Sequence, residues 1–306
     1  MSMTSKVVSL ESAVSLIKDG SSLSFSGFGH SGHPLSFVRE LIRHKPKNLT
    51  LNAIAECWPA EFLVGTDSVS TINMSNLMFE GLGRCRAISD AIEEGRVSVD
   101  DHSHLALSLR LLAAGWGVPF LPIRSMGGTD LENIQTGQRK KYSRITSPFD
   151  NEEVGAVSAL QSDVAIIHTN KSDSQGNAII YGASSVVEAQ IRGAKTVIVT
   201  TERLVSSEEI IGENQNVIIP GILVSAVAHT PFGSHPGGMY KVYDEDNDHM
   251  NLYYEASRNK KELAAYHAQY VYGMEDENQY YENLGAKRLM SLPVDPTLQF
   301  AIREWK

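Results

Sequence analysis

The sequence has 306 residues, of which 42% are apolar and 21% are charged, so the chain can bury a large core as one big domain or two modest ones. It carries 27 Lys and Arg against 36 Asp and Glu, a net charge of −9 with His neutral, which favours neither nucleic acid nor an anionic membrane as a partner. The two cysteines form no CxxC motif, which argues against a disulfide framework or a structural zinc site. The first twenty residues contain no long apolar run, so we predict no signal peptide, no membrane span and a cytoplasmic location.

Strand-like and helix-like segments alternate along the chain, and Ser9 can cap the first helix. In the first half, the predicted helices cover 10–17, 35–44, 80–95 and 105–114, and the predicted strands cover 23–25, 49–54 and 71–74. In the second half, the predicted strands cover 164–168, 178–181, 196–200, 217–219 and 222–224, with a helix near 186–191. This alternation predicts the α/β fold class, with a mainly parallel sheet covered by helices on both faces.

Three other regions complete the predicted organisation. Residues 127–153 are polar, and we expect a long loop near a pocket or a subunit interface. Residues 231–238 form a glycine-rich turn, and the chain is helical and rich in tyrosine from residue 251 onward, where the rings are expected to pack in the core and at interfaces. We therefore predict a single domain over residues 1–306, with a core of about 6–240 and a helical extension of about 241–306.

The segment 19–34, DGSSLSFSGFGHSGHP, links the strand 23–25 to the helix that begins near Leu35 through a sharp glycine turn. Such a turn bares backbone N–H groups at a helix N-terminus, which suits an anionic or carbonyl oxygen. The alternative is that the glycines only permit the turn. The spacing is not GxGxxG and there is no phosphate-loop lysine, so no nucleotide is implied.

This segment resembles the signature of the family I coenzyme A transferases. Asp19-Gly20, Gly27-Phe28, Gly32 and Pro34 fall on the pattern, whereas Ser26 stands where the first glycine of Gly-Gly-Phe is usual. Further segments resemble the α subunit of the glutaconate type of this family, and the resemblance runs from about residue 6 to 295. These segments are PFLPI at 119–123, SDVAIIH at 162–168, VTTERLVSSEEI at 199–210, FGSHPGGMYKVYDEDN at 232–247 and NLGAKRLMSL at 283–292.

The resemblance implies an NagB/RpiA-like fold and a ping-pong reaction. A Glu carboxylate takes coenzyme A from an acyl-coenzyme A through an acyl anhydride, as a glutamyl-coenzyme A thioester, and a carboxylic or dicarboxylic acid then accepts it. That Glu belongs to a Ser-Glu-Asn-Gly type motif of the family's β subunit, which this chain lacks. The resemblance therefore implies a separate β subunit in a hetero-tetramer or larger assembly, with a coenzyme A thioester as substrate and no permanently bound cofactor. A related ring-opening hydrolase of coenzyme A thioesters and a non-catalytic scaffold subunit are the alternatives.

The resemblance also places candidate substrate-binding residues in two segments. The glycine turn contributes Ser26, Gly27, Phe28, His30 and Gly32, and the segment after PFLPI contributes Arg124, Ser125, Met126 and Gly127. The Arg124 guanidinium suits a two-pronged contact with a substrate carboxylate, and a surface ion pair is the equal alternative.

Several histidines are candidates for chemistry. His104 stands where the ring-opening relatives carry a catalytic Glu, and imidazole is a suitable general base; a solvent-facing helix start is the alternative. The pairs at 30 and 33 and at 102 and 104 lack a third ligand of a zinc pattern, so we predict no metal. His168, His235 and Glu202 are interpreted as structural, with Glu202 capping the turn that follows its strand.

Overall fold

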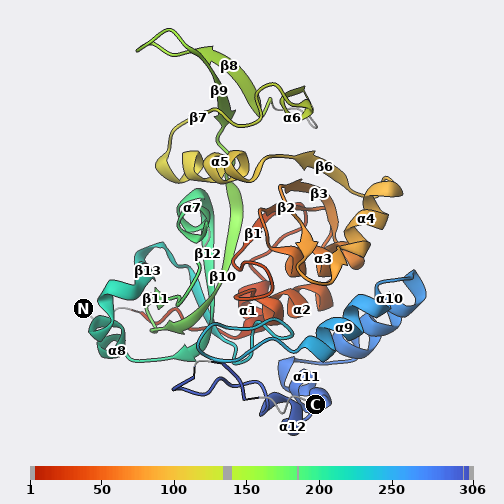
Figure 1. Ribbon diagram of the computed structural model, residues 1–306. Helices are drawn as coiled ribbons and strands as arrows, with labels where there is room; N and C mark the ends of the chain where they lie inside the picture. Colours follow the sequence, from red (N-terminus) through yellow and green to blue (C-terminus); the bar gives the residue numbers. More distant parts are fainter. Residues whose placement is uncertain (1–3, 134–139, 185, 299, 303–306) are drawn as a thin grey trace.

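The computed structural model describes residues 4–133, 140–184, 186–298 and 300–302, and it confirms the α/β class (Figure 1). Seven parallel strands run in the order β6-β3-β2-β1-β10-β12-β14. Two short strands continue the sheet: β11 (Ala178–Ile179) pairs antiparallel with β10, and β13 (Val217–Ile219) pairs antiparallel with β11. The parallel strands are β1 (Ser22–Phe25), β2 (Leu49–Ala53), β3 (Val69–Met74), β6 (Ser98–Asp101), β10 (Ser162–Ser172), β12 (Ala194–Leu204) and β14 (Ala226–His229). No helix among the described residues is long and apolar enough to cross a membrane.

The strand order reverses between β1 and β10. From β1 the chain adds β2, β3 and β6 outward on one side, whereas β12 and β14 are added outward from β10 on the other side. In open α/β sheets of this kind, ligands bind beyond the carboxyl ends of the strands at the point of reversal. The topology thus directs attention to the residues that follow β1 and those late in β10.

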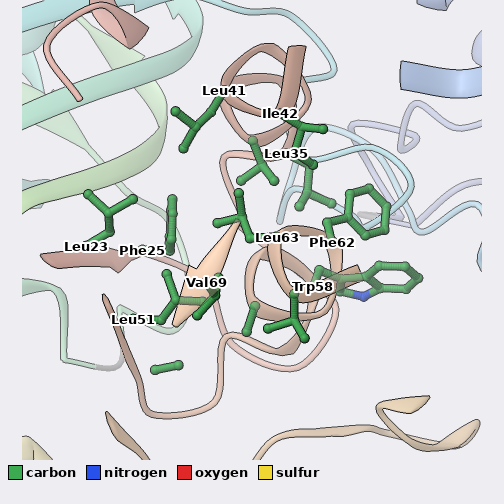
Figure 2. Close-up of a cluster of buried hydrophobic side chains, with 14 of the residues drawn as sticks. Leu23, Phe25, Leu35, Leu41, Ile42, Leu51, Trp58, Phe62, Leu63 and Val69 are labelled. Carbon is green, nitrogen blue, oxygen red and sulfur yellow. The ribbon is translucent and has the colours of Figure 1, made fainter. Parts of the chain in front are cut away.

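Helices cover both faces because successive side chains of a buried strand point in opposite directions. Val164 and Ile166 of β10 face the larger core, to which helices α1 (Leu10–Val14), α2 (Leu35–Arg43), α3 (Cys57–Gly65) and α4 (Arg86–Glu93) contribute. Figure 2 shows Leu23 and Leu51 of the sheet among the side chains of α2 and α3. Ala165 and Ile167 face the other side, which α7 (Val187–Gly193) covers next to α5 (His104–Trp116).

The helical extension packs against the larger core. Met250, Tyr253 and Tyr266 belong to the same buried cluster as the sheet residues Leu23 and Leu51. The elements of this region are α9 (Asn247–Ala256), α10 (Lys260–His267), a π-helical segment (Ala268–Tyr272), α11 (Glu277–Leu284) and α12 (Ala286–Leu289). The tyrosines at 253, 266 and 280 are buried, which agrees with the predicted packing role.

The predicted loop at 127–153 is wrong, because this segment holds the helix α6 (Asp130–Asn133) and the strand β8 (Tyr142–Thr146). β8, β9 (Glu153–Ser158) and β7 (Phe120–Ile123) form a three-stranded antiparallel sheet that projects from the main body (Figure 1). The Tyr142 ring packs over Gly155, where an added Cβ would lie 2.5 Å from the Tyr142 hydroxyl oxygen. The polar residues 142–146 are therefore ordered as a strand because they pair with β9. Residues 134–139 lie outside the described residues.

Other boundaries also differ from the predictions. The helix expected from residue 80 begins at Arg86, since β4 (Met78–Phe79) and β5 (Gly83–Arg84) form a hairpin around Gly81, whose φ is +75°. The strand expected at 222–224 is largely a 3₁₀ turn (Gly221–Leu223). Helices α3 and α8 (Ser207–Gly212) and strands β6 and β14 were not predicted. Residues 57–64 of α3 are all buried, so this helix shows no amphipathic period.

Candidate active site

A cavity of about 240 Å³ lies at the point where the strand order reverses. Its walls come from the turn after β1, from β10, from the segment after β11, from α7 and from the loop after β14. The lining residues are Ser26, Gly27, Phe28, Ser31, Gly32, His168, Ile180, Tyr181, Gly182, Ala183, Val187, Met239 and Tyr240. Among the described residues, this lining is largely apolar and contains no acidic residue, no Lys, no Arg and no Cys.

Ser26 fixes the glycine turn to the sheet. Its hydroxyl donates to the Gly32 carbonyl oxygen at 2.8 Å and accepts from the His168 N–H at 2.8 Å, and its own N–H donates to the Ile166 carbonyl oxygen at 3.0 Å. Ser26 is not among the residues with positive φ, so a side chain is tolerated here. The departure from the family pattern at this position is therefore compatible with the turn, and the hydroxyl adds two hydrogen bonds that a glycine lacks.

Gly27 is the residue of the turn that cannot carry a side chain. Its φ is +117°, and an added Cβ would lie 2.0 Å from Nδ1 of His33. The buried His33 ring bonds the carbonyl oxygens of Ser26 at 3.0 Å and Gly29 at 2.9 Å, and burial lowers the pKa of His33 to about 4. Among the described residues the Gly27 N–H has no acceptor, so it is available to an oxygen in the cavity.

A buried hydrogen-bond network supports the opposite wall. His168 contacts the Thr200 hydroxyl through Nδ1 at 2.8 Å and the Glu202 carboxylate through Nε2 at 2.7 Å. Glu202 also accepts from the Tyr243 hydroxyl at 2.6 Å and from the Phe232 N–H at 2.7 Å. These contacts hold the glycine-rich turn after β14 against the sheet, which agrees with a structural interpretation of His168 and Glu202. The turn that Glu202 caps is this one, however, and not the predicted turn that follows its own strand.

Two further histidines have both ring nitrogens engaged. The His30 ring is mostly buried; Nδ1 accepts from the Trp58 indole N–H at 2.8 Å, and Nε2 lies 2.7 Å from the Glu80 carbonyl oxygen. His235 bonds the Tyr280 hydroxyl at 2.8 Å and the Asp246 carboxylate at 3.0 Å. His30 thus supports the turn without lining the cavity. No group of three His, Cys, Asp or Glu side chains among the described residues is arranged to hold a metal ion.

The structure does not bring the segment Arg124 to Gly127 to this cavity. Arg124 is exposed and pairs with Glu152 at 2.6 Å, which is the surface alternative. The Ser125 hydroxyl contacts that of Ser103, Met126 is buried beside Tyr142, and an added Cβ on Gly127 would lie 3.1 Å from the Tyr142 hydroxyl. These residues form the base of the three-stranded sheet.

His104 lies in the first turn of α5, outside the cavity lining. Ser103 caps this helix by accepting from the Ala106 N–H at 3.2 Å, and Nδ1 of His104 is 3.4 Å from the Ser75 hydroxyl. Its side chain is exposed. The geometry therefore agrees with a solvent-facing helix start in this chain by itself.

Part of the cavity wall was not predicted from the sequence. Tyr181, Gly182 and Tyr240 line the cavity, but no pattern in the sequence marked them as candidates for binding. Tyr181 and Gly182 follow β11, which is antiparallel to β10, and Tyr240 lies in the long loop after the outer strand β14. Their place at the cavity is therefore visible only in the tertiary structure.

The parallel sheet has helices on both faces, and a cavity lies where its strand order reverses. This arrangement is typical of open α/β proteins that bind a ligand beyond the carboxyl ends of their strands. A family model described as coenzyme A transferase matches residues 7–230, so the chain belongs to the coenzyme A transferase family. The A-type subunit of glutaconate CoA-transferase from Acidaminococcus fermentans is 31% identical over 97% of this chain and 98% of its own. The crystal structure of glutaconate coenzyme A-transferase from A. fermentans matches with a TM-score of 0.91 at 29% identity, covering 98% of this chain and 99% of that one.

Two further relatives show how varied the similar proteins are. An uncharacterized protein of Archaeoglobus fulgidus is 34% identical over 95% of this chain, and the match spans only 65% of that relative's length. The cholesterol ring-cleaving hydrolase IpdA subunit of Rhodococcus jostii is 26% identical over 91% of this chain and 96% of its own. The chain is thus an α-type member of its family, and the proteins similar to it include both transferase and hydrolase subunits.

Proposed function

We propose that this chain is the α subunit of a coenzyme A transferase that moves coenzyme A between an acyl-coenzyme A and a carboxylic or dicarboxylic acid. In this proposal, a β subunit completes the active site and supplies the Glu that carries the glutamyl-coenzyme A thioester. The names of the similar transferase subunits and the matching structure support it. A cytoplasmic location is part of the proposal, supported by two cysteines that are both free thiols.

The observation that carries the proposal is a largely apolar cavity whose described lining contains no carboxylate. Gly27, whose N–H has no acceptor among the described residues, lines this cavity at the reversal point, yet no Glu, Asp or Cys is among the described lining residues. Transfer through a glutamyl-coenzyme A thioester requires a Glu carboxylate as the nucleophile. A partner subunit that places a carboxylate at the open side of the cavity would meet this requirement.

Ser26, Gly27, Phe28 and Gly32 have the roles of holding the acyl group and its carbonyl oxygen. A backbone N–H that is already aimed at the oxygen stabilises the negative charge that develops there during attack, without reorganisation. The apolar walls exclude water, which protects an anhydride or thioester from hydrolysis. His30, His104, Arg124, Ser125, Met126 and Gly127 stay predictions, because none of them lines this cavity.

The test is to co-produce this chain with its β subunit and incubate the complex with acyl-coenzyme A. Borohydride or hydroxylamine then traps any thioester, and intact mass is measured for both subunits. We expect a modified Glu on the β subunit only when this chain is present. The matched control is the isolated β subunit under the same conditions.

The other outcomes select the alternatives. Consumption of the thioester without an adduct and without an acceptor acid would establish the hydrolase, and His104 would then be the first residue to replace. Equal adduct formation and equal turnover by the isolated β subunit would assign this chain a scaffold role.

A further inference from the structure

Lys241 directly follows the lining residue Tyr240 and itself lines an adjoining hollow that shares Ser31, Met239 and Tyr240 with the cavity. Its Nζ is 5.3 Å from the ring centroid of Tyr181 and 5.8 Å from that of Tyr240, and both tyrosines line the cavity. Tyr240 is 50% exposed, so it forms part of the mouth. A Lys ammonium at this distance from two aromatic rings is attracted to them and is thereby kept near the opening.

The charge of Lys241 has no counterpart among the described residues. Within this part of the chain, no acidic side chain lies within ion-pair distance of its Nζ. The neighbouring Lys171 differs: its Nζ is 5.9 Å from the Tyr181 ring but pairs with Glu209 at 2.8 Å and Glu213 at 2.6 Å. Lys241 therefore forms no ion pair with a described residue, and it stands beside a cavity whose described lining contains no Asp, Glu, Lys or Arg.

The backbone holds Lys241 in this place. The Met239 N–H donates to the Tyr243 carbonyl oxygen at 2.9 Å, and the N–H groups of Val242 and Tyr243 donate back to the Met239 carbonyl oxygen at 2.8 and 3.1 Å. Within this tight loop Lys241 has a φ of +65°, a left-handed conformation that lysine rarely adopts. The Gly32 N–H donates to the Gly238 carbonyl oxygen at 3.0 Å, so this loop and the glycine turn are fixed to each other.

The size of the cavity sets what fits between Gly27 and Lys241. Because one water takes about 30 Å³ of the liquid, a cavity of 240 Å³ has room for roughly eight non-hydrogen atoms. A five-carbon dicarboxylic acyl group has about this many atoms. Gly27, Tyr181 and Tyr240 all line this cavity, so an acyl group with its carbonyl oxygen at Gly27 shares the space with the two rings that Lys241 contacts.

Building on the proposed function, we propose that Lys241 binds the second carboxylate of a dicarboxylic acyl group and selects such substrates over monocarboxylic ones. An anionic oxygen is the chemistry that an unpaired ammonium group recognises, and the phosphates of coenzyme A offer the same chemistry. The location of Lys241 over cavity-lining rings favours the carboxylate, and the experiment separates the two sources.

The experiment uses the complex of this chain with its β subunit, with acetyl-coenzyme A as donor and two five-carbon acceptors, glutarate and pentanoate. For Lys241→Met we expect kcat/KM for glutarate to fall about tenfold or more, since a hydrogen bond to a charged group is lost. The value for pentanoate and the KM for acetyl-coenzyme A stay within about twofold. Lys241→Arg keeps most of the preference for glutarate. Lys18→Met is the matched control. Lys18 forms no ion pair with a described residue, and it precedes the amino end of β1, whereas the cavity lies beyond the carboxyl end of that strand.

Equal losses for both acids, or a higher KM for acetyl-coenzyme A, would overturn the proposal and assign Lys241 to the coenzyme A phosphates. If the wild-type complex transfers coenzyme A to no acid, the proposed function is wrong. Calorimetric titration of glutarate into the wild-type and Lys241→Met complexes then decides the role of Lys241. Equal affinities would overturn it, and a tenfold weaker affinity for the variant would support it.

Discussion

At position 27 the chain has no room for a side chain, because the His33 ring occupies the place where a Cβ would lie. A side chain at position 27 would therefore be unfavourable for two reasons: the backbone has a positive φ, and the added Cβ would lie 2.0 Å from Nδ1 of the buried His33 ring. Ser26, one residue earlier, avoids both and adds hydrogen bonds of its own. The turn therefore requires glycine at position 27 but accepts serine at position 26.

The Gly27→Ala variant is expected to lower the free energy of unfolding by about 3 kcal/mol, from left-handed strain plus overpacking, and to abolish acyl transfer. Gly20→Ala is the matched control: φ there is +77° but nothing lies within 4 Å of an added Cβ, so only the strain of about 1 kcal/mol remains. Chemical denaturation of both variants measures the difference. Equal losses would show that the His33 contact does not matter.

Among the elements, α2 joins the helical extension to the sheet through one buried side chain. The Arg39 guanidinium donates to the Glu277 carboxylate of α11 and, at 2.7 Å, to the His235 carbonyl oxygen, and it lies 3.9 Å from the Tyr280 ring centroid. Arg39 is 1% exposed. Removing Arg39 leaves Glu277 with Arg43 of α2 as its remaining partner at 3.1 Å and takes a donor from the His235 carbonyl oxygen, so buried hydrogen bonds to charged groups are lost although Glu277 stays paired.

Replacement Arg39→Met is therefore expected to cost about 2 to 3 kcal/mol and to make the chain after residue 246 more accessible to limited proteolysis. Arg258→Met is the comparison, because its pair with Glu255 at 2.6 Å is more than half exposed on both sides and is expected to cost less than about 0.5 kcal/mol. If the two variants lose equal stability, burial of the Arg39 pair is not what anchors α11.

At the scale of the whole molecule, buried histidines make stability depend on pH. Burial lowers the pKa of His33, His102 and His267 to about 4, that of His249 to about 3, and that of His235 below its usual value. In the unfolded chain a histidine binds its proton near pH 6.5, whereas these folded ones do so only at lower pH. Each of them therefore lowers the free energy of unfolding as the pH falls through this window.

Two buried carboxyl groups act in the opposite direction. Burial raises the pKa of Glu56 and Glu61 to about 7, so the folded chain binds their protons before the unfolded chain does, between pH 7 and about 4.5. They stabilise the fold as the pH falls in that range. With five histidines against two carboxyl groups, we expect a net loss of stability in acid.

His267 isolates one of these contributions, because burial alone lowers its pKa and its Nε2 has no hydrogen-bond partner among the described residues. Relative to the wild type, His267→Phe should lose about 1.4 kcal/mol less per pH unit between pH 6.5 and 4. Urea unfolding at several pH values measures both slopes. Parallel slopes would contradict a depressed pKa for His267.

Local sequence patterns predicted much of this architecture. The apolar runs of β1, β10 and β12, the Ser9 cap of α1 and the glycine turn each depend on neighbouring residues, and each was found where expected. Helix α3 was missed because burial on all sides removes its period, and β8 was missed because its regular structure comes from pairing with β9. Elements whose stability comes from distant partners left no local signal.

The candidate site divides in the same way. Ser26, Gly27, Phe28 and Gly32 were named from the resemblance of the glycine turn to the family signature, and they line the cavity, because a strand-to-helix turn is a local structure that such a signature specifies. The position of Arg124 away from the cavity, and of Tyr181, Tyr240 and Lys241 around it, was decided by the strand order and by the hydrogen bonds between loops far apart in the chain. The sequence by itself thus determined the α/β class and the turn, since backbone conformation follows from nearby residues. Only the tertiary structure decided which side chains surround the cavity, since that depends on how distant segments pack.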